Sequence, residues 1–164
     1  IIDTGVFGII AILTGAVFAW IGGHLDDHFG PKAIIRICIL LLTGVSICIV
    51  FVSRDSVFGV PVEATSRLPD ILFYILGAVI GAAGGVIQAA SRSMMVRQAQ
   101  PDRITVAFGL YALAGKATSF IAPLSIGVLT GLTGSQQIGV TPLILLFLTG
   151  LILLRFVKPE GDPR

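Results

Sequence analysis

Lys116 is the residue whose surroundings most strongly suggest chemistry, because it is a charged side chain inside a long apolar run. It follows Arg103 by 13 residues, which corresponds to about 20 Å along a helix. A charge near the centre of a bilayer costs about 2.5–3.5 kcal/mol on insertion scales, so such residues are rarely accidental. We expect the ammonium to face a polar cavity, where its partner would be a carboxylate from another part of the protein or an anionic group of a solute. The alternative is that the flexible side chain extends to the membrane surface.

Three more polar side chains are expected to contribute to the same cavity. Ser119 lies one helical turn after the lysine, Tyr111 lies before it, and Gln88 lies on the preceding apolar run. Pro123 has no N–H, so it leaves a carbonyl of the preceding turn unpaired and is expected to kink the helix. Bent helices with polar inner faces are common in membrane transporters.

Two other patterns suggest chemical sites that we do not expect. The pair Gly115–Lys116 does not form a phosphate-binding loop, because Leu110 and Ala117 stand where that motif needs a glycine and a hydroxyl side chain. His24 and His28 lie one helical turn apart beside two aspartates, but a turn at the membrane edge is not expected to hold a metal. No set of nucleophile, base and acid is present, so we expect neither an enzyme nor a cofactor. No cluster of basic and aromatic residues indicates a nucleic-acid partner.

The composition indicates that helices in a lipid bilayer position these residues. Of the 164 residues, 55% are hydrophobic and 12% are charged, and the mean hydropathy is +0.99. A soluble domain carries about 25% charged residues, so this chain has too little polar material to cover a water-facing surface. Because a bilayer offers no water to the backbone, the apolar runs are expected to be α-helices.

Five apolar runs are long enough to cross the hydrocarbon core, which takes about 17–25 helical residues. We therefore predict an all-α, polytopic membrane bundle that occupies the whole chain, 1–164. Its five expected spans are Gly5–Gly22, Ala33–Val52, Ile71–Ala90, Val106–Thr130 and Thr141–Val157. On the third span, small residues recur at three- and four-residue steps, which is typical of close helix packing in lipid. They include Gly77, Gly81 and Gly85.

The distribution of basic residues predicts the orientation of the bundle, because Lys and Arg favour the cytoplasmic side. Eight of them flank the first and third connectors and the C-terminal end, whereas two flank the second connector. This asymmetry predicts an extracytoplasmic N-terminus and a cytoplasmic C-terminus. The chain does not begin with Met and opens directly on an apolar run, so we expect it to be part of a longer protein.

The first connector, Gly23–Lys32, has the pattern Gly-x-x-x-Asp-x-x-Gly-x-Lys. Gly23 is expected to allow a close approach of the helix ends, and Gly30 to support a tight reversal. Asp27 is expected to accept hydrogen bonds from the N-terminus of a neighbouring helix, where the helix dipole favours an anion. Lys32 is expected to anchor the following helix at the lipid headgroups. The alternative is an ordinary polar turn without a specific role.

This connector resembles the loop signature of the major facilitator superfamily, with matches at Gly23, Leu25, Asp27, Gly30 and Lys32. The stretch Gly81–Leu124 resembles the vacuole-effluxer-like branch of that superfamily, which includes fungal vacuolar amino-acid effluxers and bacterial permeases. The features that carry this resemblance are Gln88-Ala-Ala-Ser-Arg-Ser93, Phe108-Gly-Leu-Tyr111 and Gly115-Lys116-Ala-Thr-Ser119. It implies that the spans correspond to helices eight to twelve of a twelve-helix fold.

The resemblance implies a secondary transporter, a permease or effluxer, that moves an amino acid or another organic anion. The solute would bind between this C-terminal part and an N-terminal half of the same protein, by alternating access, with a proton as the expected coupling ion. The expected location is a bacterial inner membrane. Two other classes remain open, namely a membrane scaffold or receptor without a transport cycle, and an integral membrane enzyme.

Overall fold

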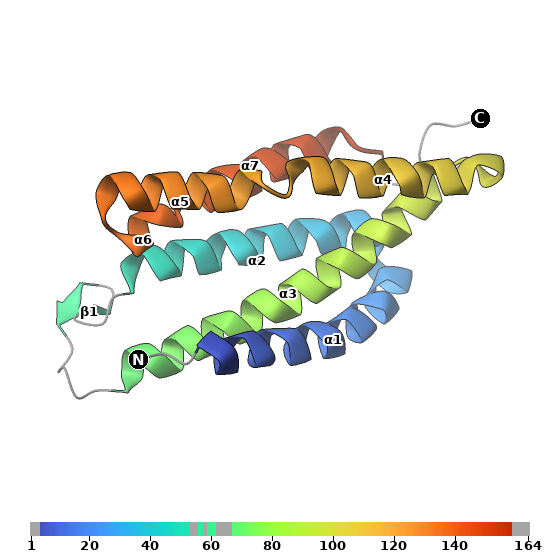
Figure 1. The fold of residues 1–164 in the computed structure, drawn as a ribbon. Coiled ribbons are helices and arrows are strands. Elements are labelled where there is room, and N and C mark those ends of the chain that lie inside the picture. The colour runs from blue at the N-terminus through green and yellow to red at the C-terminus, as the bar shows by residue number, and fades with distance from the viewer. Residues whose placement is uncertain (1–3, 53–55, 58, 62–66, 159–164) are drawn as a thin grey trace.

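The computed structural model describes residues 4–52, 56, 57, 59–61 and 67–158, and these form mainly long helices. Five of the described segments are long and apolar enough to cross a membrane (Figure 1). They are Gly5–Phe29, Pro31–Phe51, Leu68–Gln98, Pro101–Thr133 and Gln136–Phe156. The structure therefore confirms the predicted all-α membrane architecture.

The first three segments are single helices, α1 (Thr4–Phe29), α2 (Pro31–Phe51) and α3 (Leu68–Gln98). The fourth consists of the 3-10 turn η1 (Pro101–Arg103) and the helices α4 (Ile104–Thr118) and α5 (Ile121–Thr133). The fifth consists of the short α6 (Gln136–Gly139) and α7 (Thr141–Phe156). Between α2 and α3, β1 (Ser56–Val57) pairs with β2 (Val60–Pro61) in an antiparallel hairpin.

Successive segments run in opposite directions, so their connections alternate between the two ends of the bundle (Figure 1). The α1–α2 turn, the α3–α4 connection and the C-terminus of α7 lie at one end, which we call the Gly30 end. The β-hairpin and the α5–α6 connection lie at the opposite end. Basic residues of two connections and of the C-terminus of α7, all far apart in the sequence, are thereby brought to one end of the molecule.

The helices extend further than the apolar runs predicted. α1 continues through His24–Phe29, a stretch that the sequence pattern assigns to a polar connector, and α3 continues past Ala90 to Gln98. The apolar run marks only the part of a helix that suits hydrocarbon, whereas backbone hydrogen bonds continue through polar residues at the membrane edge. The predicted connector Gly23–Lys32 is therefore wrong, since Gly30 alone separates α1 from α2.

Gly30 permits this abrupt reversal through its backbone conformation. Its φ of 75° and ψ of 150° lie in a region that is essentially restricted to glycine. Its N–H donates to the carbonyl of Asp26 at 3.0 Å, and Pro31 then opens α2 at a position that needs no N–H. Gly23 is predicted to allow a close approach at this turn, but no described atom lies within 4 Å of the place that a Cβ would take there. The close approaches of α1 therefore lie elsewhere along the helix.

α1 and α3 approach so closely that side chains would not fit between their backbones. A Cβ atom on Gly81 would collide with the backbone of Ala11. One on Gly85 would collide with the backbone of Gly15, and one on Gly77 with a phenylalanine ring of α1. In lipid, where no hydrophobic force drives helices together, such backbone contacts are a main source of helix association. The three glycines of the stripe therefore lie at the α1–α3 contact.

The apolar core lies between α2 and α3, and α7 packs against it. Its buried members are Ile34, Ile35, Cys38, Ile39, Leu42, Ala83, Val86, Ala90 and Met94. By contrast, α4 and α5, which the structure describes in full, contain no buried residue. Most of the surface of these two helices is therefore not covered by the described part of the chain.

Replacing Gly81 with alanine should destabilise the bundle, because its Cβ would meet the Ala11 backbone, which cannot move aside without displacing α1. We expect a loss of about 1–3 kcal/mol, the usual cost of overpacking. Gly84→Ala is the matched control on the same helix, since nothing lies within 4 Å of its Cβ position. Thermal unfolding of the full-length protein in detergent would compare the two. Equal unfolding temperatures for Gly81→Ala and Gly84→Ala would show that the close contact between Gly81 and the Ala11 backbone does not contribute to the stability of the protein.

Candidate functional site

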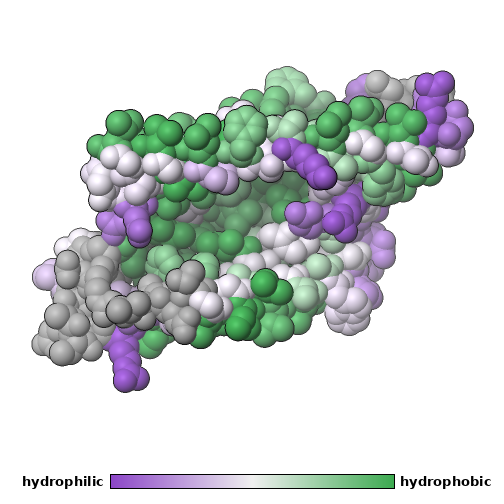
Figure 2. All heavy atoms as spheres, in the orientation of Figure 1, coloured by the Kyte–Doolittle hydropathy of each residue, from purple (hydrophilic) through white to green (hydrophobic). Residues whose placement is uncertain are grey.

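One face of the bundle is hollowed between the α4–α5 rod and the α1–α3 pair (Figure 2). The floor of the hollow is mostly hydrophobic, and hydrophilic side chains reach over it from the rim (Figure 2). α4 contacts α3 and η1, whereas α5 contacts α6 and α7. Within the part of the chain that the structure describes, the fourth span, α4 and α5, is thus attached to the other helices mainly near its two ends.

Lys116 lies near the middle of this span, in the last turn of α4. About 18 Å of helix separates it from Ile104, where α4 begins, and the whole membrane-spanning segment runs from Pro101 to Thr133. Its side chain is exposed, and its ammonium forms no hydrogen bond or ion pair with any residue that the structure describes. The C-terminal end of a helix carries partial negative charge, so a cation is favoured there.

The fourth span is interrupted directly after Lys116. α4 ends at Thr118 and α5 begins at Ile121, and the two residues between them keep right-handed helical backbone angles, so the fourth span has a short break where a kink is predicted. Pro123 has no N–H for the carbonyl of Ser119, four residues earlier, and the interruption falls at this point. The Lys116 carbonyl, at the end of α4, accepts hydrogen bonds from the Ser119 hydroxyl at 2.9 Å and from the Ser119 N–H at 3.4 Å.

Tyr111 joins α4 to α3 nearer the Gly30 end. Its phenol oxygen lies 2.9 Å from the Oγ atom of Ser91, so the two hydroxyl groups share a hydrogen bond. Gln88 lies one turn before Ser91 on α3, and its side chain is exposed. A cavity of about 390 Å³ opens beside this contact, with Met94 and Leu110 among its lining residues.

The structure does not gather the four predicted cavity residues into one cluster. Lys116 follows Tyr111 by five residues, a rotation of about 140° around α4, and it does not line the cavity beside Tyr111. Ser119 turns its hydroxyl back onto the α4 backbone. Lys116 and Ser119 thus lie together at the helix break, whereas Tyr111 lies at the α3–α4 contact with Ser91, and the exposed Gln88 side chain does not line the cavity there.

The buried carboxylate near the α1–α2 turn belongs to Asp26, whereas the sequence pattern points to Asp27. The Asp26 side chain is 6% exposed, and its Oδ2 atom accepts a hydrogen bond from the Ser93 hydroxyl of α3. The guanidinium of Arg97, one turn further along α3, lies 3.5 Å from the same oxygen. Asp27 is exposed and accepts no hydrogen bond from the described part of the chain, so its predicted role is not observed there.

A pattern in α1 distinguishes the two aspartates. Ala11, Gly15 and Gly22 form the stripe of small residues that faces α3. Asp26 follows Gly22 by four residues and therefore continues this stripe, while Asp27 is rotated a further 100° or so around the helix. The Asp26 Oδ1 atom is buried and has no hydrogen-bond partner among the described residues.

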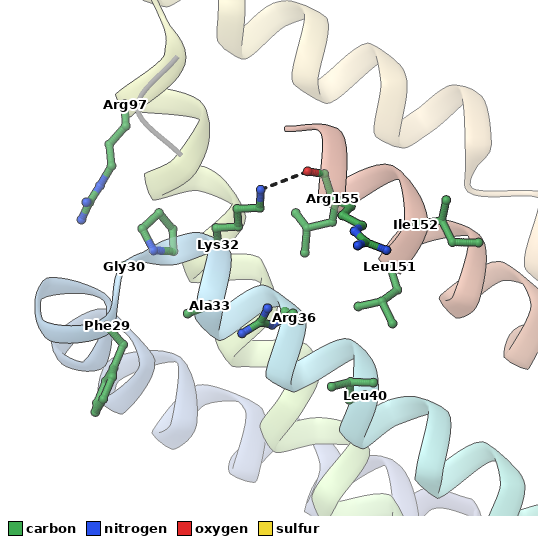
Figure 3. Close-up of a pocket in the computed structure, with 12 residues that line it drawn as sticks. Phe29, Gly30, Lys32, Ala33, Arg36, Leu40, Arg97, Leu151, Ile152 and Arg155 are labelled. Atoms are coloured by element: carbon green, nitrogen blue, oxygen red, sulfur yellow. Dashed lines mark hydrogen bonds between the residues drawn. The ribbon is translucent and has the colours of Figure 1, made fainter. Parts of the chain in front are cut away.

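Lys32 links α2 to the C-terminus of α7. Its ammonium donates to the carbonyl of Val157 at 2.6 Å. It also donates to the carbonyl of Arg155 at 3.3 Å (Figure 3). The Gln98 amide of α3 donates to the next carbonyl, that of Lys158, at 2.7 Å. The carbonyls at a helix C-terminus carry partial negative charge, so those of Arg155 and Val157 suit a cation. Lys32 thus caps the end of α7 in the structure, and its anchoring at the lipid headgroups stays a prediction.

The His24–His28 pair does not converge with the aspartates on a common point. The Nδ1 atom of His24 lies 3.0 Å from the carbonyl of Trp20, and the two rings pack with centroids 4.8 Å apart. Among the residues that the structure describes, no three His, Cys, Asp or Glu side chains are placed to hold a metal ion.

Asp26→Asn should destabilise the full-length protein, because it removes the negative charge of the Asp26 carboxylate on α1, which Ser93 and Arg97 of α3 contact. We expect a loss of about 1.5 kcal/mol, the low end for hydrogen bonds to charged groups, since Arg97 is 42% exposed. Asp27→Asn is the matched control and should change stability by less than about 0.5 kcal/mol. Thermal unfolding in detergent measures both. A larger effect at Asp27 than at Asp26 would contradict this assignment.

The comparisons with known proteins agree on one family. Residues 2–164 match the family model described as Major Facilitator Superfamily. The uncharacterized MFS-type transporter YxiO of Bacillus subtilis (strain 168) is 30% identical over 148 residues, which cover 90% of this chain and 31% of the relative. The chain thus spans about a third of the length of this curated relative. No solved structure shows significant similarity to this chain. The chain belongs to the Major Facilitator Superfamily.

Proposed function

We propose that this chain is part of a secondary transporter that moves a small solute by alternating access. The observation that carries the proposal is the interruption of the fourth span beside Lys116, near the middle of this membrane-length segment. Secondary transporters bind solutes and coupling ions near the bilayer midplane, at helices interrupted in this way. Membership of the superfamily and the similarity to an MFS-type transporter support the same function.

In this proposal, the chain supplies helices eight to twelve of a twelve-helix transporter, and an N-terminal half faces the hollow beside α4–α5. Two observations support the arrangement. The match covers only 31% of the curated relative, and every residue of α4 and α5 remains at least partly exposed. The motif resemblance around Gln88 and Tyr111 supports the vacuole-effluxer-like branch of the superfamily.

The proposed solute carries a carboxylate, as an amino acid or another organic anion does. Lys116 provides an exposed cation at membrane depth, and no carboxylate of the described residues neutralises it. A desolvated ammonium is costly unless it is paired, so an anionic solute or a carboxylate of the N-terminal half would stabilise it. Ser119 lies beside it at the break, and Tyr111 and Gln88 would line the path towards the Gly30 end. A proton is the proposed coupling ion.

We propose that the Gly30 end is cytoplasmic in a bacterial inner membrane, with the N-terminus of the chain on the opposite side. The positive-inside rule supports this orientation. The basic residues at this end come from α2, α3, η1 and α7, and they include Lys32, Arg36, Arg97, Arg103, Arg155 and Lys158. At the opposite end, Arg67 is the one basic residue among those that the structure describes.

Lys116→Ala should lower solute transport about 10- to 100-fold, because it removes a charged hydrogen-bond donor from the proposed carboxylate site. Lys116→Arg keeps the charge and should retain part of the activity, and Lys158→Ala should transport like the unmodified protein. Uptake of radiolabelled amino acids and dicarboxylates into proteoliposomes that contain the full-length protein would measure this. Expression and thermal unfolding of each variant serve as folding controls.

Other outcomes separate this proposal from its rivals. Unchanged uptake in Lys116→Ala would remove Lys116 from the solute site while leaving transport intact. The absence of uptake and exchange for every carboxylate tested would favour a scaffold or receptor. Turnover of a solute into a chemically different product would indicate an enzyme. Each outcome would replace the proposal with a distinct alternative.

A further inference from the structure

We propose that a basic cavity between α2 and α7, at the Gly30 end, binds the headgroup of an anionic phospholipid. The cavity has a volume of about 720 Å³ and includes none of the residues of the proposed solute path. Its walls come from the first turns of α2, the last turns of α7, and side chains near the ends of α1 and α3 (Figure 3). Anionic-lipid sites of membrane proteins are commonly basic pockets between helix ends.

The charge of the cavity favours an anion. Four cationic side chains line it, and no acidic side chain does; the four are Lys32, Arg36, Arg97 and Arg155. Two of them already have partners, since Arg97 pairs with Asp26 and Lys32 donates to the carbonyls at the end of α7. The other two remain for a ligand.

Arg36 and Arg155 are the groups that would contact the headgroup. Both are exposed, and neither guanidinium is paired with an acidic residue of the described chain. They stand on neighbouring helices that pack against one another, and both line the same cavity (Figure 3). A guanidinium is a planar donor that binds two oxygens of a phosphate at once, so this pair suits a phosphodiester.

The apolar part of the cavity favours a lipid over a free phosphate ion. Leu40 lies one turn beyond Arg36 on α2, and Ile152 lies about one turn before Arg155 on α7, so both stand deeper in the membrane than the arginines. These side chains are 52% and 61% exposed, and Leu151 lies beside them in the cavity wall (Figure 3). Cationic side chains beside an exposed apolar groove suit an amphiphile with an anionic headgroup, whose acyl chain would lie along the groove that α2 and α7 form.

The test is native mass spectrometry of the delipidated full-length protein titrated with dioleoyl phosphatidylglycerol or with dioleoyl phosphatidylcholine. We expect one phosphatidylglycerol molecule to bind more tightly than phosphatidylcholine. Each arginine near an anionic lipid contributes about fivefold in affinity, so Arg36→Gln/Arg155→Gln should weaken binding of the first phosphatidylglycerol by about 25-fold. Arg92→Gln/Arg103→Gln removes the same charge outside the cavity and should leave this binding step unchanged.

Two further measurements separate the proposal from its alternatives. Arg36→Lys/Arg155→Lys keeps both charges but loses the planar donor that binds two phosphate oxygens, so it should restore only part of the lipid affinity lost in Arg36→Gln/Arg155→Gln. Inorganic phosphate at millimolar concentration should not displace the lipid, whereas displacement would identify a site for the free ion. Equal losses in the cavity variant and in the Arg92/Arg103 control would show general attraction to the membrane surface. Either of these last two results would overturn the proposal.

Discussion

In lipid, two helices reach backbone contact only where side chains are absent, and α1 meets α3 in this way at Gly15, Gly81 and Gly85. This contact fixes the register of the two helices along their length. It places Asp26 against the end of α3, so that the carboxylate is buried where Ser93 and Arg97 lie. The reversal at Gly30 follows at once, and α2 returns along α3 to form the buried core. The α1–α3 contact is thus the constraint on which the Gly30 end depends.

The fourth span is held differently from this packed unit. α1 and α3 are in backbone contact, α2 and α3 form the buried core against which α7 packs, and Lys32 of α2 caps α7. By contrast, α4 and α5 contain no buried residue. The break after Thr118 divides the fourth span near its middle, so its two halves are attached through opposite ends of the bundle. A segment with few packed neighbours is suited to face another half of a larger protein. The proposed lipid cavity belongs to the packed unit, and the proposed solute locus belongs to the fourth span.

Hydropathy alone predicts the five spans, because lipid requires long apolar helices whatever their partners are. It does not predict their ends, since His24–Phe29 is polar and still helical. A local rule about proline predicts a disturbance near Pro123, whereas the contact between Tyr111 and Ser91 depends on how two helices meet. The loop pattern favours Asp27 over Asp26, and only the helical register along α1 favours the aspartate that is buried. The sequence thus predicts the helical spans and the effect of a proline on its own helix, but it does not predict which side chains of different helices make contact.

The accessibility of position 116 to water tests the central claim most directly. Lys116→Cys would be introduced into the full-length protein in membrane vesicles and treated with a membrane-impermeant thiol reagent, after replacement of the native cysteines. Ala114→Cys provides the control, because it lies at nearly the same depth but about 160° away around α4. The account predicts rapid labelling at position 116, slow labelling at position 114, and protection of position 116 by a transported carboxylate. Equally slow labelling at both positions would place Lys116 against lipid or packed protein and would contradict a solute cavity at the helix break.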